Sequence, residues 1–427
     1  MGYRQFSSHR VLLAQLAIVL GVLSFAGTAE AQVVGASIWG TVRDSSGDGI
    51  PAVSVTIKNL ETGAARKLVS DESGRYVAPS IAVGRYEVIA DKEGFSSQVK
   101  TGIDLVVGQT STVDLVLPVG EVRQVVTVED KAPAVSVSTQ QTSGLVNERQ
   151  VKELPLNGRS YDNLMSLNPG VVNYTSERSG GVGTSNSAVG NMFVVSGRRS
   201  QENLFLLNGV EYTGASLINL SPGGASGQLL GVDAVREFNV VTDAYGAEYG
   251  KRPGAQISII TASGANQVHG SVYEFMRNSA LDARNFFDQG GVPQFQRNEF
   301  GGAIGGPIQK DKTFLFGNYE GFRQHLGLTD VTLVPDNNAR AGYLPGANGN
   351  LKKIGVAPSV QPLLSLWPVQ NGPELGGGIA EAFSHPLQII REDSGPYVLT
   401  TRSPTKTRCL AFIQSTTVRT ILHPSTR

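Results

Sequence analysis

The residue types that usually carry catalysis or bind metals are sparse in this chain of 427 residues. The five histidines are His9, His269, His325, His385 and His423, and none stands in the H-E-x-x-H spacing of zinc enzymes. The single cysteine, Cys409, excludes an internal disulfide and a cysteine metal site. There is no G-x-S-x-G elbow and no G-x-x-x-x-G-K-[ST] loop. We therefore expect no enzyme, no catalytic residue and no cofactor.

Three carboxylates near the N-terminus, Asp44, Asp48 and Asp71, have the ligand chemistry of a calcium site. They lie in two runs of turn-forming residues, 45–49 and 71–74 with their neighbours. Aspartate in such runs commonly accepts hydrogen bonds from the backbone of its own turn. We prefer this turn-capping interpretation and predict no metal site.

The elements that would have to position any site are short strands. Charged residues make up 17% of the chain, below the usual quarter or so, and the 51 glycines favour many turns. The net charge is zero, so the chain lacks the excess of positive charge that is typical of nucleic-acid-binding proteins, and we expect no nucleic-acid partner. The composition predicts a mainly β fold.

The first 31 residues have the pattern of a secretory signal peptide. A basic segment over residues 4–10 precedes the apolar run Val11–Phe25, and Ala29-Glu30-Ala31 supplies small residues for cleavage before Gln32. The alternative is a membrane anchor, but the run is shorter than the ~20 residues that a spanning helix needs. No later stretch is long and apolar enough for such a helix, so any membrane role would need strands.

Residues 32–119 contain about seven strand-like runs separated by turns every 8–12 residues, which is typical of a β-sandwich. The predicted strands are residues 37–43, 53–59, 65–70, 75–78, 85–90, 97–103 and 112–117. The segments "GTVRDSSGDGIPAVSVTIKN" and "DESGRYVAPSIAVGRYEVIADKEGF" resemble the carboxypeptidase regulatory-like domain. The matching positions are Gly40, Asp44, Gly49, Pro51, Val55, Asp71, Gly74, Tyr76, Gly84, Tyr86 and Val88. This resemblance implies a prealbumin-like sandwich close to starch-binding folds, and it brings no zinc set.

Residues 120–265 change character and include a low-complexity stretch over residues 179–190. The segments "LPLNGRSYDNLMSLNPGV" and "EYGKRPGAQISIITASGANQVHGSVYEF" resemble the plug of TonB-dependent outer-membrane transporters, in the subgroup with an N-terminal carboxypeptidase regulatory-like domain. The resemblance implies a mixed α+β plug domain. Asn208 departs from the aspartate usual in this subgroup, which puts one polar contact in doubt.

Residues 266–392 are expected to form the N-terminal part of a transmembrane β-barrel. Runs over residues 268–277, 297–304 and 313–323 are close to the ~9–11 residues of a tilted membrane strand. Six aromatic residues are predicted to face lipid or its interfaces: Phe275, Phe300, Phe314, Phe316, Tyr319 and Phe322. Residues 331–392 are predicted to form a long outer loop and the approach to another strand. Without the resemblance, an ordinary soluble sheet remains open.

Residues 393–427 are interpreted as an aberrant tail. The segment after Asp393 has no alternation, holds the only cysteine and is basic without an acidic residue. Such a charge run is usually a solvated tail. Plausible codons read out of frame give a sequence resembling the family's next barrel strand, so we favour a frameshift that truncates the barrel. A chain truncated in this way is expected to be unable to transport and to remain in the periplasm if its barrel cannot form.

One segment is a candidate for partner binding. Val125, Val126, Thr127 and Val128 precede the plug, where the family keeps its energy-coupling box. An extended β-branched segment can add as a strand to a periplasmic TonB-type coupling protein. The alternatives are a linker strand or the last edge of the sandwich.

The resemblance therefore predicts an outer-membrane TonB-dependent receptor with three partners: the coupling protein, outer-membrane lipid, and an unknown small ligand or glycan. The alternative is a secreted or periplasmic β-sandwich that binds carbohydrate or protein. Exposed aromatic platforms would favour this alternative, but the strand position of Trp39, the one tryptophan of the sandwich, predicts that it lies in the core.

Overall fold

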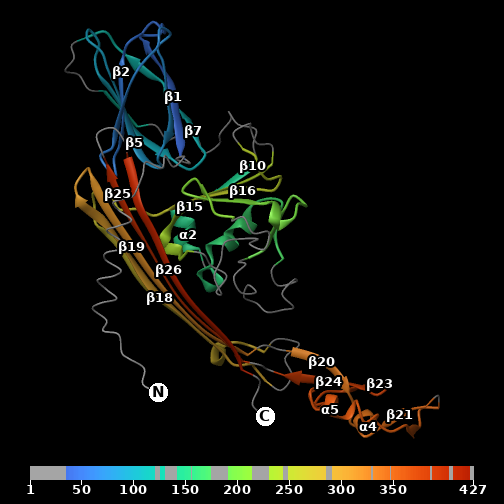
Figure 1. The fold of residues 1–427 in the computed structure, drawn as a ribbon. Coiled ribbons are helices and arrows are strands. Elements are labelled where there is room, and N and C mark those ends of the chain that lie inside the picture. Colours follow the sequence, from blue (N-terminus) through green and yellow to red (C-terminus); the bar gives the residue numbers. More distant parts are fainter. Residues whose placement is uncertain are drawn as a thin grey trace.

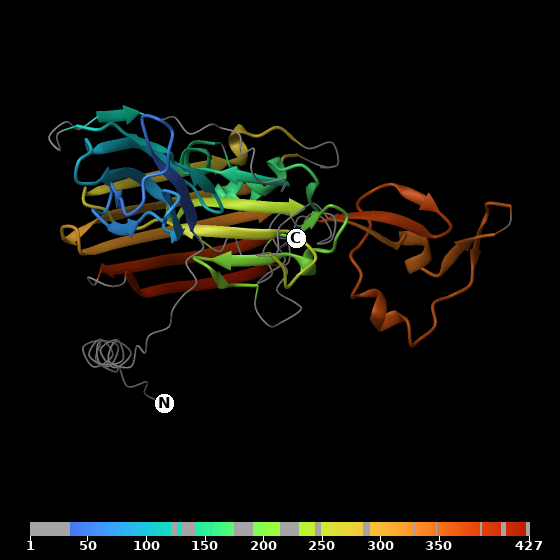
Figure 2. The same ribbon diagram turned by 90° about the horizontal axis from the view of Figure 1, so that it is seen from above.

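The computed structural model describes residues 35–120, 126–129, 142–154, 156–174, 191–213, 230–243, 249–284, 291–327, 330–346, 348–384, 387–402 and 407–423. The predicted signal peptide and the low-complexity stretch lie outside these ranges. A sandwich, a central domain and a long curved sheet follow one another along the chain (Figure 1). Figure 2 shows a small lobe, residues 330–384, extending from the end of the long sheet that is away from the sandwich.

The N-terminal unit is a two-sheet β-sandwich, as predicted. The first sheet contains β1 (Ala36–Asp44), β4 (Arg75–Ile81), β7 (Thr110–Thr112) and β8 (Leu115–Leu117), and β1 pairs with the other three. The second has the order β3 (Ala65–Val69), β2 (Ser54–Asn59), β5 (Gly84–Asp91), β6 (Gln98–Leu105), β9 (Val126–Glu129). Alternate residues of each long strand enter a shared core, which includes Ile38, Val55, Val88 and Leu115.

Two of the three turn carboxylates of the sandwich, those of Asp44 and Asp71, accept hydrogen bonds from the backbone of their own turns. Asp44 Oδ1 accepts hydrogen bonds from the N–H groups of Ser46 and Asp48, at 2.9 and 3.0 Å. Asp71 Oδ1 does the same for Ser73 and Arg75, at 2.9 and 2.8 Å. These contacts agree with the turn-capping interpretation.

The prediction that Trp39 lies in the sandwich core is wrong, because its side chain is 45% exposed. The inward positions of β1 are taken by Ile38 and Gly40, and a Cβ at Gly40 would lie 2.0 Å from the Val113 carbonyl oxygen. Only glycine fits there, so residue 40 must lie on the inner face of β1. Because neighbouring residues of a strand point to opposite faces, the side chain of Trp39 points outward. It lies on the outer face with Val77, its register partner on β4, which is also exposed.

The central domain is the mixed α+β unit that the sequence predicted. Its main sheet has the order β10 (Thr142–Val146), β15 (Val235–Asp243), β16 (Gln256–Thr261), β13 (Leu204–Leu207), β14 (Val210–Glu211), with β13 and β16 parallel. Helix α2 (Glu148–Glu153) and a hairpin of β11 (Val171–Asn173) and β12 (Phe193–Val195) accompany it. Short 3₁₀ turns are η1 (Asn157–Arg159), η2 (Tyr161–Leu167), η3 (Ser200–Glu202) and η4 (Val232–Ala234). Phe193, Phe205 and Phe238 are the largest fully buried side chains of its own core.

Asn208 keeps a polar contact although it departs from the expected aspartate. Asn208 and Gly209 have φ angles of 49° and 85°, the left-handed pair that a tight Asn-Gly hairpin requires. The Asn208 side chain accepts a hydrogen bond from the Thr261 N–H at 3.1 Å and donates one to Thr261 Oγ1 at 2.9 Å. The turn between β13 and β14 is thereby tied to the end of β16.

The long sheet is antiparallel, with the order β17 (His269–Asn278), β18 (Phe295–Gln309), β19 (Thr313–Gly327), β25 (Leu387–Arg402), β26 (Thr407–His423). The three predicted strands are present, and β18 and β19 are longer than predicted, at 15 residues each. Strand β25 passes residue 393 without interruption, and β26 pairs along it. Among the described residues the sheet stays open, with β17 and β26 as its edges. A 3₁₀ turn, η5 (Ser279–Leu281), follows β17.

The prediction that six aromatic residues face lipid is wrong for four of them. Phe314, Phe316 and Phe322 are buried on the concave face, and Phe275 lies on that face with its ring 5.1 Å from the Arg159 guanidinium. They share strand parity with Glu320 and Tyr273, whose polar groups must face away from lipid. Only Phe300 and Tyr319 lie on the outer face, with ring centroids 6.3 Å apart.

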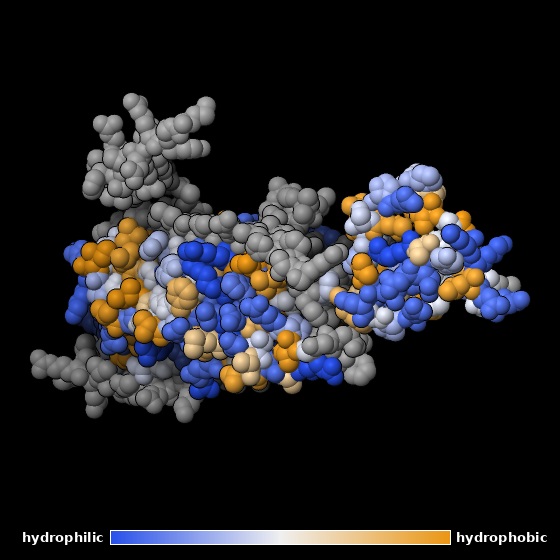
Figure 3. Space-filling view, turned by 90° about the horizontal axis from the view of Figure 1, so that it is seen from below, coloured by the Kyte–Doolittle hydropathy of each residue, from blue (hydrophilic) through white to orange (hydrophobic). Residues whose placement is uncertain are grey.

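The predicted outer loop is an ordered lobe between β19 and β25. It contains β20 (Asp330–Pro335), α4 (Asn337–Arg340), β21 (Tyr343–Pro345), β22 (Leu351–Lys353), α5 (Gln361–Leu364), β23 (Glu374–Gly376) and β24 (Ile379–Ser384). Arg340 holds the lobe together by donating to the carbonyl oxygens of Leu364 and Trp367, each at 2.9 Å. Apolar residues reach its surface in patches (Figure 3), among them Leu366 and Trp367. Within the described ranges, no helix has the length and hydrophobicity to span a membrane.

We predict that residues 32–119 fold alone as a β-sandwich, because their core is made within the segment. Replacing buried Ile38 with alanine should lower the free energy of unfolding of this fragment by about 2–5 kcal/mol. The matched change Val77→Ala, on the exposed face, should change it by no more than about 0.5 kcal/mol. Urea unfolding followed by circular dichroism measures both. A non-cooperative melt, or equal effects of the two changes, would contradict the proposed core.

Candidate functional site

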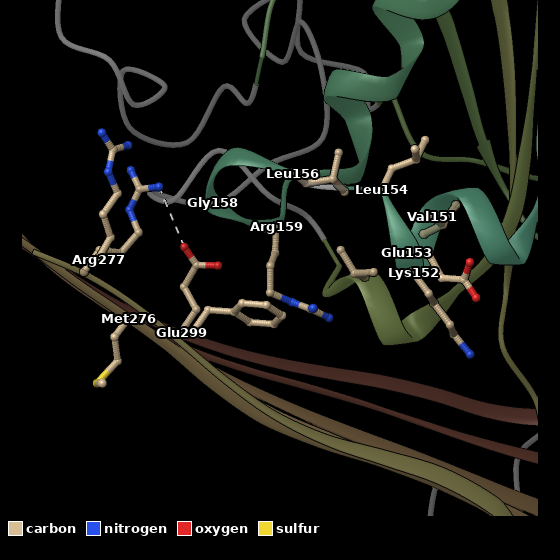
Figure 4. A pocket seen from close by; sticks show the side chains of 13 residues that line it. Val151, Lys152, Glu153, Leu154, Leu156, Gly158, Arg159, Met276, Arg277 and Glu299 are labelled. Carbon is tan, nitrogen blue, oxygen red and sulfur yellow. Dashed lines mark ion pairs between the residues drawn. The ribbon is translucent and has the colours of Figure 1, made fainter. Parts of the chain in front are cut away.

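A cavity of about 580 Å³ separates the central domain from the concave face of the long sheet (Figure 4). The central domain contributes α2 and the turn after it, including Val151, Leu156 and Arg159. The long sheet contributes Phe275 and Glu299. Charged and apolar side chains therefore face each other across it.

Local sequence directs Arg159 into this interface. Helix α2 is capped at its start by Asn147, which forms a capping box with Gln150, and its C-cap is Leu154. Gly158 and Arg159 then have φ angles of 69° and 47°, so the chain turns sharply. In Figure 4 the Arg159 side chain points from this turn toward the long sheet.

Arg159 forms the centre of a buried polar latch, defined here as Arg159, Asp233, Ser271, Tyr273 and Glu320. The Arg159 guanidinium pairs with Asp233 Oδ2 at 2.7 Å and lies 3.7 Å from the centroid of the Tyr273 ring. Ser271 Oγ donates to Asp233 Oδ1, and the Tyr273 hydroxyl donates to Glu320 Oε2, both at 2.8 Å. Two of these contacts cross the interface: Ser271 is hydrogen-bonded to Asp233, and Arg159 lies on the ring of Tyr273. The Arg159–Asp233 ion pair is internal to the central domain, and the Tyr273–Glu320 hydrogen bond is internal to the sheet.

The latch continues along the sheet through a second ion pair. Arg297 NH1 lies 3.7 Å from Glu299 Oε1, the pair drawn as a dashed line in Figure 4, and Arg297 Nε donates to Gln324 at 2.9 Å. Some buried polar atoms lack a hydrogen-bond partner among the described residues, including Arg159 Nε and both polar atoms of the Asn318 side chain. The interface is therefore polar and incompletely satisfied, unlike the apolar core of either part.

A second interface joins the sandwich to the central domain. Glu61 accepts two hydrogen bonds from Arg236 on β15, at 2.9 and 3.1 Å. The Val107 N–H donates to Glu237 Oε1 at 2.6 Å. The Asn266 N–H donates to the Glu61 carbonyl oxygen at 2.9 Å, where the central domain leads into β17.

Burial dominates the electrostatics of Glu237. Its side chain is taken out of water between the two domains, and this raises the pKa of Glu237 to about 7. The Val107 N–H and the Arg236 charge oppose the rise. In the central domain, burial also raises the pKa of Asp162 to about 6, against hydrogen bonds from Ser160 and Asn191.

The candidate coupling segment lies at the edge of the sandwich. Val125 is outside the described residues, and Val126, Thr127 and Val128 belong to β9. Strand β9 pairs in parallel with β6, so the segment occupies the position of a sandwich edge strand. Its role in partner binding stays a prediction.

The sequence interpretation missed both interfaces. Arg159 stands inside the quoted "LPLNGRS" motif, but its partner Asp233 is 74 residues away. A usable signal was the presence of Glu299 and Glu320 inside predicted membrane strands, since charged residues there face the barrel interior.

Comparison with known proteins gives two family matches and one curated relative. Residues 37–118 match the carboxypeptidase regulatory-like domain, and residues 260–393 match the outer membrane beta barrel domain. Over 330 residues the chain is 26% identical to the TonB-dependent transporter Oar of Myxococcus xanthus, covering 73% of this chain and 29% of Oar. The chain thus spans less than a third of that relative's length.

Two solved receptor structures are similar to 62% of this chain. The ferric enterobactin receptor of Pseudomonas aeruginosa, a Q482A mutant in complex with enterobactin, is 15% identical, with 31% of its chain covered and a TM-score of 0.35. The siderophore receptor PirA of Acinetobacter baumannii is 16% identical, with 38% covered and a TM-score of 0.32. These relatives are transporters and receptors, not enzymes.

We predict that Arg159→Ala destabilises the central domain together with its attachment by about 3–5 kcal/mol, because it leaves Asp233 buried without its cation and removes the contact with the Tyr273 ring. The matched control is Arg149→Ala, whose side chain is 83% exposed and whose loss should cost at most about 1 kcal/mol. Adding Asp233→Ala to Arg159→Ala should recover part of the loss. Denaturant unfolding in detergent micelles measures the three variants. Equal stability of the Arg159→Ala and Arg149→Ala proteins would refute the latch.

We predict that the contact between sandwich and central domain weakens as pH rises. The pKa of Glu237 goes from an ordinary 4.5 to about 7, so the folded state favours the protonated form. Its stabilising contribution is complete below about pH 4.5 and is lost as pH rises through about 7. The full change is about 3 kcal/mol, since one pKa unit corresponds to about 1.4 kcal/mol.

Hydrogen exchange at residues 105–109, measured from pH 5 to 8 and corrected for the intrinsic rate, tests this. Protection should fall with pH in the wild-type protein and stay level in Glu237→Gln. Glu93→Gln, at an exposed position, should behave as wild type. A pH dependence that persists in Glu237→Gln would assign the effect to another group.

Proposed function

Because this chain belongs to the TonB-dependent receptor family, we propose that its central domain is the plug of an outer-membrane receptor that takes up a small ligand. The observation that carries the proposal is the polar latch between the central domain and the concave face of the long sheet. A plug must be held in the barrel and yet be able to move. Polar contacts serve both needs, because water can replace them when the parts separate.

Connection lengths support an orientation in the membrane. The turn between β18 and β19 spans only residues 310–312 and lies at the sandwich end, where Asn266 donates to Asp311 at 2.7 Å. The connections at the other end are long and include the lobe of residues 330–384. Membrane barrels have short periplasmic turns and long extracellular loops. We therefore propose that the sandwich lies in the periplasm and the lobe outside the cell.

The outer face of the long sheet supports a membrane band. Near the sandwich end this face presents exposed apolar side chains, among them Ile304, Ile308 and Leu315. Toward the lobe it becomes polar at Asp393, which accepts hydrogen bonds from Tyr319 at 2.8 Å and from Arg323 at 2.6 Å. A tyrosine beside a charged row is expected where hydrocarbon meets headgroups.

Uptake requires that the strands belong to a closed wall. In hydrocarbon, every backbone N–H and C=O must be paired, and β17 and β26 each leave one edge open among the described residues. These edges must therefore pair with further strands before the sheet can seal a plugged pore. The nature of the ligand, a small molecule or a glycan, depends on the extracellular side.

A second function, glycan or protein binding by the sandwich, is supported by the exposed indole of Trp39. Val77 and Thr112 are its register partners on the neighbouring strands, so this face offers one aromatic platform. We favour the receptor role, because glycan or protein binding by the sandwich alone would not require the polar latch between the central domain and the long sheet.

Energy for uptake is proposed to come from a periplasmic TonB-type coupling protein that pairs with the segment Val125–Val128. Pairing through the backbone predicts that Thr127→Pro with Val128→Pro, which removes two N–H groups, weakens binding of the periplasmic domain of such a protein at least about tenfold. Thr127→Ala with Val128→Ala keeps both N–H groups and should bind within about threefold of wild type. Biolayer interferometry with the purified chain in detergent measures both. Wild-type affinity of the proline variant would locate coupling elsewhere.

A further inference from the structure

The turn between β2 and β3 of the sandwich, residues 60–64, is held rigid by its own hydrogen bonds. Asn59 Oδ1 accepts hydrogen bonds from the N–H groups of Glu61 and Thr62, both at 2.9 Å. The Gly63 N–H donates to the Asn59 carbonyl oxygen at 2.9 Å, and Gly63 has a φ of 69°, which suits glycine. Because the Asn59 side chain is buried, the turn has a fixed position on the sandwich.

This turn contacts both the central domain and the long sheet. In Figure 1 the sandwich lies at one end of the long sheet and beside the central domain. The Glu61 carboxylate bonds to Arg236 of β15, and the Glu61 carbonyl oxygen accepts a hydrogen bond from the Asn266 N–H at 2.9 Å. The Asn266 side chain is bonded in turn to Asp311, between β18 and β19, at 2.7 and 2.9 Å. A Cβ on Gly63 would overlap the Asp311 carboxylate, so the turn lies directly against the sheet.

A β-bulge in β15 directs two neighbouring side chains at the sandwich. Between Val235 and Glu237 the pairing with β16 shifts by one residue, so Arg236 is the extra residue of the bulge. In a regular strand, Arg236 and Glu237 would point to opposite faces. At the bulge both reach the sandwich, Arg236 at Glu61 and Glu237 at the backbone N–H of Val107.

The bulge lies beside the polar latch. Asp233 accepts a hydrogen bond from Ser271 of the sheet and pairs with Arg159, and it precedes Arg236 by three residues. The segment of residues 233–237 therefore meets the long sheet at one end and the sandwich at the other. If this segment moves away from the sheet as part of the central domain, the contacts with the docked sandwich must break as well.

We propose that the turn of residues 60–64 is a clamp on the seam between the central domain and the long sheet. Docked, it holds both sides, so the central domain leaves the sheet only after the sandwich has detached. A rigid turn in contact with both sides loses its contacts with one of them when they separate, and hydrogen bonds between charged groups such as Glu61 and Arg236 contribute strongly to such a contact. The inference rests on the proposed plug role and adds an autoinhibitory element to it, since a docked sandwich keeps the plug in place.

The seam offers a position for a chemical probe. Ala262 of the central domain is 7% exposed and packs with Phe316 and Val398 of the sheet. In a Cys409→Ser background, which removes the one native cysteine, Ala262→Cys places a single thiol in the seam. The rate at which this thiol reacts with a maleimide, in the full chain in detergent, measures how often the seam opens.

The clamp predicts that Glu61→Ala raises the labelling rate at least about tenfold, because the bonds to a charged, largely buried partner are lost. Arg236→Ala should act in the same way, and the double variant should exceed the faster single variant by no more than about twofold, because both changes remove the same contact. The matched control is Glu87→Ala. The Glu87 side chain is 17% exposed, as is that of Glu61, but it pairs with Lys58 inside the sandwich. Its loss should leave the labelling rate within about twofold.

Hydrogen exchange at residues 86–90 of β5 shows whether the sandwich of each variant stays folded. Faster labelling of Glu61→Ala with unchanged protection in β5 supports the clamp. Faster labelling that comes with lost protection in β5, or that is equally fast in Glu87→Ala, overturns it, since a general loss of sandwich stability is then the cause. Unchanged labelling in Glu61→Ala also overturns the clamp. The plug role then stands if Arg159→Ala accelerates labelling, and it fails with the clamp if Arg159→Ala has no effect.

Discussion

Arg159 is the buried cation on which the attachment of the central domain to the long sheet depends. Its side chain is 11% exposed, and its charge is balanced by Asp233 and shared with the face of Tyr273. The apolar clusters give little help. Among the described residues, the core of the central domain ends within that domain, and Ala262 alone joins a cluster with Phe316 and Val398 of the sheet. The contacts that reach the sheet are the Ser271–Asp233 hydrogen bond and the stacking of Arg159 on Tyr273. Such contacts between buried charged groups and polar partners are strong while water is excluded and weaken once water enters. Such an attachment suits a part that must be both fixed and movable.

The strands of the sandwich could be predicted because their pattern is local. Alternation and turn residues fixed β1 to β6 within a few positions, whereas the predicted strand 112–117 is two short strands, β7 and β8. The facing of individual side chains was harder. Phe316 and Phe322 have the same parity as Glu320, and a carboxylate in a membrane strand excludes lipid on its side. Starting from the acidic residue would have predicted that these rings face inward. In the same way, starting from Gly40 would have predicted that Trp39 faces outward.

The two interfaces could not be derived from spacing, because their partners are far apart in the chain. Asp233 follows Arg159 by 74 residues, and Arg236 follows Glu61 by 175. No periodic pattern links such positions. Arg159 and Asp233 meet when the central domain folds, and Glu61 and Arg236 meet only when the sandwich and the central domain come together. The turn at Gly158 and Arg159 has an unusual backbone conformation. Which residue of the sheet the Arg159 side chain contacts depends, however, on how the central domain lies against β17. The local sequence pattern therefore predicts helices, strands and turns. Which polar residues contact one another is decided only by the way the chain folds and its domains pack together.

The order of attachments along the chain determines where a pull on β9 would act. The chain leads from β9 to β10, which is an edge strand of the central sheet and pairs on one side with β15. Strand β15 is itself held by β16 and by the contacts of Arg236 and Glu237 with the sandwich. A load entering through β10 therefore meets one ladder of backbone hydrogen bonds before it reaches any ion pair. Edge strands with a single neighbour open at lower cost than strands paired on both sides. Within the central domain, the β10–β15 ladder is thus the first contact to open, while Arg159 still holds the rest of that domain against the long sheet.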